Sequence, residues 1–126
     1  MLDTTSPLDH MASPPLQPDD QPIDFAHLFR MTLGDHSLER EVLQLFDRQA
    51  QMIIGRMVAS ERAAIAALAH TLKGSARGIG AWGVASAAEI LETASKAAGD
   101  LEPAVEALSQ AASKARETIA HHLLAR

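Results

Sequence analysis

The chain has 126 residues, enough for one domain, and 47% of them are hydrophobic, which can supply a core. It has no cysteine, so disulfides and thiolate metal sites are excluded, and this composition suits a reducing compartment. No apolar run is long enough to cross a membrane, and no secretory signal is visible, so we expect a cytoplasmic protein without membrane contact. The net charge of −5, the lack of a basic run and an aromatic content of 3% argue against nucleic-acid binding.

Residues 1–22 are predicted to form a disordered tail. This segment holds five prolines and four aspartates but no lysine or arginine. Residues 23–126 are predicted to form the folded domain, which is nearly neutral.

The first two predicted helices are separated by Gly34. The first is short, from about residue 24 to 33, and glycine ends it because it adopts the left-handed cap conformation at low cost. The second begins near Ser37. Apolar residues at helical spacing predict its core stripe: Leu38, Val42, Leu45, Phe46, Ile53 and Met57.

The third predicted helix follows Ser60 and Glu61, which can cap it, and it ends where Gly78 and Gly80 interrupt the pattern. Its core stripe comprises Ile65, Leu68, Leu72 and Ile79.

The last two helices are expected from about residue 82 to 98 and from Pro103 towards the C-terminus, with Gly99 between them. The fourth-helix core face contains Ala88, Leu91 and Ala98; the last helix uses Val105, Leu108, Ala112, Ile119 and Leu123. Short loops between long amphipathic helices favour antiparallel neighbours. The predicted fold is therefore all-α: an antiparallel up-and-down four-helix bundle with a short extra N-terminal helix.

His70 is the residue that suggests chemistry. At about 100° per residue it lies roughly 160° from Leu68 and Leu72, so it points away from the predicted core. Lys73 and Gly74 lie one turn further along the helix. A glycine within a helix costs about 1 kcal/mol relative to alanine, so Gly74 calls for a reason. Either it gives clearance to a partner, or it packs closely against a neighbouring helix, or it is simply tolerated.

An exposed neutral imidazole can attack phosphorus through Nε2 without a base to remove a proton, and Lys73 can stabilise the added negative charge. Phosphoryl transfer depends mainly on positioning and electrostatics, so few residues are needed. A histidine with a lysine three residues later is also common on solvated helix surfaces. On spacing alone, the solvated-surface interpretation is therefore favoured.

Residues 70–75 read His-Thr-Leu-Lys-Gly-Ser, with Gly80 ten residues after the histidine, and this resembles the signature of histidine-containing phosphotransfer (HPt) domains. The stretch from Asp24 to Phe46 is also similar to that family, so the resemblance covers roughly residues 23–124. It implies that His70 is phosphorylated, that Lys73 supports the phosphate and that Gly74 gives a receiver domain room. Gly80 would be structural, at the end of the helix.

Several other residues are candidates for the same face. A chain reversal near Gly80 brings positions near 90 to the height of His70, where the polar candidates are Glu89 and Glu92. Many members of the resembled family carry a glutamine or carboxylate 22 positions after the histidine. Glu92 is therefore our candidate to orient the imidazole, and Glu89 a rim residue; the alternative for both is a solvated surface charge. The remaining binding candidates around the histidine are Ala66, Ala67 and Arg77, of which the arginine is as readily a solvated surface residue.

The resemblance implies a bacterial phosphorelay intermediate that takes a phosphoryl group from a receiver aspartate, or from a kinase, and passes it to another receiver. Response-regulator receiver domains and a hybrid histidine kinase are the expected partners, and we expect a monomer. No nucleotide-binding loop and no acidic set for Mg²⁺ is visible, so we expect no ATP-dependent kinase activity and no cofactor or metal. The alternative is a non-catalytic helical module that docks receivers or serves as a scaffold.

Other residues receive a structural interpretation. His27 and His36 are expected at the surface or in caps, and a metal site at His121 and His122 is not favoured. We expect three large apolar side chains to fill the core or line its edge: Met52, Met57 and Trp82.

Overall fold

The computed structural model describes residues 21–125, in which all regular secondary structure is helical. The predicted tail of residues 1–22 falls outside the described part of the chain except for its last two residues. The helices are α2 (Phe25–Met31), α3 (His36–Met57), α4 (Arg62–Ile79), α5 (Trp82–Ala94) and α6 (Glu102–Leu124).

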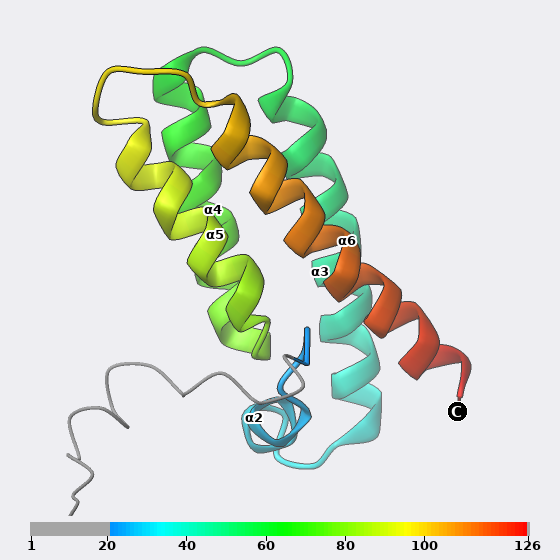
Figure 1. Cartoon of the computed structure of the whole chain (residues 1–126). Coiled ribbons are helices and arrows are strands. Elements are labelled where there is room, and N and C mark those ends of the chain that lie inside the picture. Colours follow the sequence, from blue (N-terminus) through cyan, green and yellow to red (C-terminus); the bar gives the residue numbers. More distant parts are fainter. Residues whose placement is uncertain (1–20, 126) are drawn as a thin grey trace, which may run out of the picture.

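Four long helices, α3 to α6, run side by side in alternating directions, and the short α2 lies across one end of the bundle (Figure 1). Each long helix contacts the next, and α3 also contacts α6, so the four form a closed ring in chain order. In this ring α3 and α5 are diagonally opposite. The predicted all-α bundle with a short extra N-terminal helix is confirmed.

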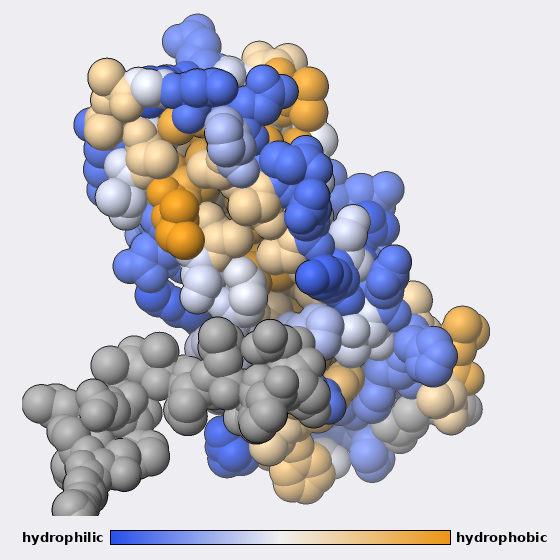
Figure 2. Space-filling model, viewed as in Figure 1, coloured by the Kyte–Doolittle hydropathy of each residue, from blue (hydrophilic) through white to orange (hydrophobic). Residues whose placement is uncertain are grey.

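The core is built from aliphatic side chains and many alanines. Alanine is a strong helix former with a small side chain, which lets neighbouring helices approach closely. Apolar residues also show as a band between α5 and α6 in Figure 2, bordered by hydrophilic side chains on the outer faces. The largest fully buried side chains are Phe46, Ile23, Leu28, Leu43, Leu72, Leu91, Leu108, Ile119 and Val84.

The predicted core stripe of α3 is wrong at two positions. Leu38 and Leu45 are exposed, whereas Leu43 and Ala50 are buried. Phe46, Ile53 and Met57 are buried as predicted, while Val42 is partly buried. Apolar residues occur on two faces of this helix, and the pattern alone cannot tell which face meets the core.

The ends of α4 differ from the prediction. Ser60 does not cap α4: its hydroxyl donates to the carbonyl of Arg56, 2.7 Å away, at the end of α3. Glu61 occupies the N-cap position without a side-chain bond. Gly78 lies inside the helix, and Gly80 alone ends it, with a φ of 83°.

Helix α5 is shorter than predicted and ends at Ala94, so Ala98 lies beyond it and is exposed. Arg62 donates hydrogen bonds to the carbonyls of Ser95 and Ala97 and so satisfies backbone acceptors at this end. Met52 is half exposed, contrary to its predicted place in or beside the core.

Candidate functional site

The turn between α4 and α5 sets the geometry of the site. Gly80 takes the left-handed conformation, and its carbonyl accepts a hydrogen bond from the Asp24 backbone N–H at 2.9 Å. A Cβ added at Gly80 would lie 2.9 Å from the Asp24 carbonyl oxygen, so a side chain does not fit. The tight reversal lays α5 antiparallel to α4 and brings Glu92 beside His70.

His70 lies on α4 with 67% of its side chain exposed. Its Nδ1 is 3.0 Å from Oε2 of Glu92 on α5, which is hydrogen-bonding distance. The described residues give the other ring nitrogen, Nε2, no hydrogen bond. The imidazole is thus held from one side and open on the other.

Glu92 is the centre of a group of three cations or potential cations. Only 15% of its side chain is exposed, and its Oε1 is 2.8 Å from Nζ of Lys73. The Lys96 ammonium lies 3.9 Å from Oε2. The Lys73 ammonium, with the smaller help of the His70 ring, holds the pKa of Glu92 below its usual range, against the opposing effect of burial. Glu92 is therefore an anion near neutral pH.

Lys73 is largely covered, and 15% of its side chain is exposed. It reaches from α4 towards α5 to pair with Glu92, so the cation that the sequence assigned to a phosphate is bound to a carboxylate in this structure.

Gly74 is exposed, and a Cβ added to it would meet nothing within 4 Å. No helix of residues 21–125 packs against this position. Close packing against a neighbouring helix, one of the three reasons considered for this glycine, is therefore excluded within the described residues.

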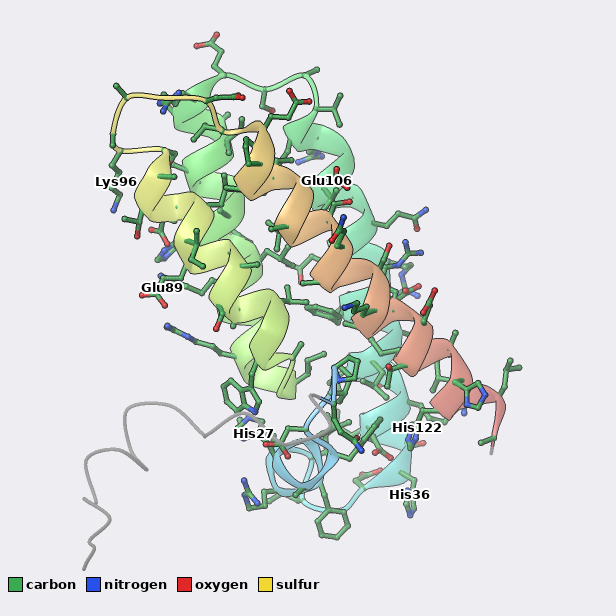
Figure 3. The ribbon with its side chains drawn as sticks, viewed as in Figure 1. His27, His36, Glu89, Lys96, Glu106 and His122 are labelled. Carbon is green, nitrogen blue, oxygen red and sulfur yellow. The ribbon has the colours of Figure 1, made fainter. Side chains whose placement is uncertain are left out.

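The remaining binding candidates lie on the same two helices. Arg77 on α4 and Glu89 on α5 are 3.4 Å apart, and both are more than half exposed. Ala67 is exposed and Ala66 is partly buried. Figure 3 shows that Glu89 on α5 and Lys96, two residues beyond the end of α5, project on the side away from α6. Lys96 was missed in the sequence, although its position four residues after Glu92 could have indicated it.

A polar cluster beneath the site was also missed. The Trp82 indole Nε1 donates to Oδ2 of Asp24 at 3.0 Å, and the edge of the His27 ring packs against Trp82. Nε2 of His27 lies 3.1 Å from the carbonyl oxygen of Arg77. The hydrogen bond from Trp82 is the main reason why the pKa of Asp24 is lowered, although burial acts in the opposite direction. This cluster ties α2 to the turn that places Glu92.

The other histidines lie away from His70. His36 and His122 flank the buried Glu39, each with a ring nitrogen 3.5 Å from one of its carboxylate oxygens, at the end of the bundle where the C-terminus lies (Figure 3). Residues 21–125 contain no group of three side chains suited to hold a metal ion. No helix in that range is long and apolar enough to cross a membrane.

Comparison with protein families places these observations in one class. The Hpt domain family matches residues 41–123, which is more than half of the chain. The chain therefore belongs to the Hpt domain family, the histidine phosphotransfer domains of phosphorelays, whose members interact with receiver domains in two-component systems. Comparison with curated proteins and with solved structures gives no significant match.

Proposed function

We propose that this protein is a phosphorelay intermediate in which His70 accepts a phosphoryl group from the aspartate of one receiver domain and passes it to another. A hybrid histidine kinase would supply the first receiver. The observation that supports this best is the pairing of His70 Nδ1 with Glu92 at 3.0 Å on an imidazole that is 67% exposed.

The carboxylate fixes the reactive nitrogen. Because Glu92 is an anion that can only accept hydrogen bonds, the proton of a neutral His70 ring resides on Nδ1. The lone pair is then on Nε2, the nitrogen that faces solvent. Glu92 thus acts as a positioning residue.

The transfer step then needs no proton removal. The Nε2 lone pair attacks the phosphorus of the receiver's aspartyl phosphate, a P–N bond forms, and the bond between phosphorus and the carboxylate oxygen breaks. The electron pair of that bond returns to the aspartate. The Nδ1 proton stays with the ring, and Glu92 stabilises the positive charge that the ring then carries. The reverse sequence passes the group to the next receiver.

Lys73 would support the phosphoryl group. It lies one turn from His70 and its ammonium is already aligned by Glu92, so contacting a phosphoryl group on the ring would have a small further entropic cost. Its charge would attract the phosphoryl oxygens and moderate their repulsion by Glu92.

The receiver would approach over α4. Gly74 and Ala67 present almost no side chain there, so a partner surface can come close to the ring. Ala66 would line the same patch, while Arg77 and Glu89 would form a charged rim.

Transfer of label from a receiver tests this proposal. The purified protein is incubated with a receiver domain carrying ³²P on its aspartate, and acid-labile, alkali-stable label is measured. We expect label on the wild type and none on His70→Gln. His121→Gln is the matched control, because His121 is also an exposed helical histidine but lies on α6.

Equal labelling of His70→Gln would show that His70 is not the acceptor. Binding of receivers without any label on the wild type would instead favour the docking module.

A further inference from the structure

Helix α3 carries a second apolar row that points away from the core. Leu38, Leu45 and Met52 are seven residues apart, and 39%, 58% and 50% of their surfaces are exposed. Seven residues are nearly two turns, so the three side chains lie in one row. Val42, which is partly buried, borders this row. We call these four residues the α3 seam; within residues 21–125 no helix covers it.

Two opposite charges follow one side of the seam. Glu41 and Arg48 are also seven residues apart, and both are exposed. Neither takes part in a salt bridge among the described residues. An apolar row with a flanking row of charges is the arrangement with which one helix recognises another.

The order of these residues suits a second copy of the same helix. In a two-fold contact, residue i meets residue j and j meets i. When two α3 helices pack antiparallel, the flanking row of one runs beside the same row of the other. The register that sets Val42 against Leu45 of the second copy brings Glu41 beside Arg48 of the second copy. The two-fold axis repeats both contacts.

Neighbouring registers are less favourable. Sliding one helix by seven residues sets Arg48 beside Arg48 of the second copy. This adds repulsion between like charges and removes both Glu41–Arg48 pairs. Only the first register combines apolar contact at the centre of the seam with two opposite-charge pairs.

We propose that the α3 seam binds a second copy of this chain and forms an antiparallel, two-fold dimer. This departs from the monomer expected from the sequence. The proposal does not depend on phosphotransfer. His70 lies on α4, which is next to α3, and its ring pairs with Glu92 on α5, the helix diagonal to α3 (Figure 1).

Sedimentation equilibrium over a concentration series tests the dimer. The mass of the wild type should rise from 13.4 kDa towards about twice that value as concentration increases. Leu45→Glu should keep the monomer mass, because a charge would be buried at the centre of the contact. Circular dichroism checks that each variant is folded.

Charge exchange tests the register. Glu41→Arg alone or Arg48→Glu alone should raise the dissociation constant about tenfold, because each creates two like-charge pairs. The double exchange should restore the wild-type constant, and a mixture of the two single variants should form mixed dimers. Lys114→Glu, at an exposed position of α6 away from the seam, is the control and should change nothing.

Three results would overturn the proposal. The wild type could keep the monomer mass up to about 1 mM. The double exchange could fail to recover association. Leu45→Glu could show the same rise in mass with concentration as the wild type but slow transfer from a receiver, in which case the seam binds the receiver and not a second copy.

Discussion

At the residue scale, the central feature is that one carboxylate holds two partners on α4. Glu92 accepts from the His70 ring and pairs with the Lys73 ammonium, and its lowered pKa keeps it charged for both. We therefore propose that this single side chain on α5 sets both the tautomer of the imidazole and the place of the cation. Substitutions at this position separate these two effects.

Glu92→Gln should keep an acceptor for Nδ1 through its amide oxygen and lose the charge, whereas Glu92→Ala loses both. We expect transfer to slow by about tenfold in the glutamine variant and by about a hundredfold in the alanine variant. The ¹⁵N shifts of the His70 ring report the tautomer directly. They should show Nδ1–H in the wild type and the glutamine variant but a mixture in the alanine variant. An unchanged tautomer in Glu92→Ala would rule out a positioning role.

Gly74 permits a test of clearance that is separate from stability. Because a Cβ there meets nothing within 4 Å, Gly74→Leu should leave the fold intact and raise the free energy of unfolding by up to about 1 kcal/mol. Transfer from a receiver should fall by at least about tenfold, since the leucine occupies the approach path. Phosphorylation of His70 by phosphoramidate, a small donor, should keep its wild-type rate. Slowing of both reactions alike would place the defect in the imidazole and not in docking.

At the element scale, the position of α5 depends on its two ends. Gly80 fixes the start through its left-handed turn, and Arg62 fixes the end by donating to carbonyls after the last helical turn. Both contacts come from outside α5. The helix that carries Glu92 is therefore held at both ends by α4 and its flanking residues.

Arg62→Ala should leave those carbonyls without a protein donor. We expect a loss of about 1–2 kcal/mol in the free energy of unfolding by urea. Arg62→Lys should lose less stability than Arg62→Ala, because its ammonium can still donate to some of the carbonyls that the guanidinium contacts. Arg56→Ala, an exposed arginine on α3 with no side-chain bond among the described residues, is the control and should change stability by less than about 0.5 kcal/mol. An Arg62→Ala variant as stable as this control would show that water replaces the capping bonds at no cost.

At the scale of the whole molecule, local patterns predicted the bundle, because helical periodicity and turn glycines are visible within short windows. The tight turn expected at Gly80 placed Glu89 and Glu92 near His70, and the family resemblance selected Glu92 of the two, which is the one that contacts the ring. The correct face of α3 could not be predicted, because Leu38 and Leu45 are as apolar as the residues that are buried. Contacts between distant segments, such as Asp24 with Trp82, have no local signal.

That distant contact should govern how the whole molecule responds to acid. The Asp24 pKa is depressed below its ordinary value of 3.8, chiefly by the Trp82 hydrogen bond. A depressed carboxyl pKa means that its stabilising effect is fully present above pH 3.8 and is lost as pH falls through the lower, folded-state value. Asp24→Asn should therefore be less stable than the wild type by about 1 kcal/mol near neutral pH, and this difference should shrink below about pH 4.

Urea unfolding at several pH values between 2 and 7 measures this difference. Glu117→Gln is the control, because Glu117 is exposed on α6 and its side chain makes no hydrogen bond or ion pair among the described residues. Loss of the Asp24 carboxylate loosens the link between α2 and the turn at Gly80, so every helix that this turn aligns becomes easier to unfold. A stability difference that stays constant from pH 7 to pH 2 would mean that Asp24 acts through its shape and backbone bonds, and that its charge contributes nothing.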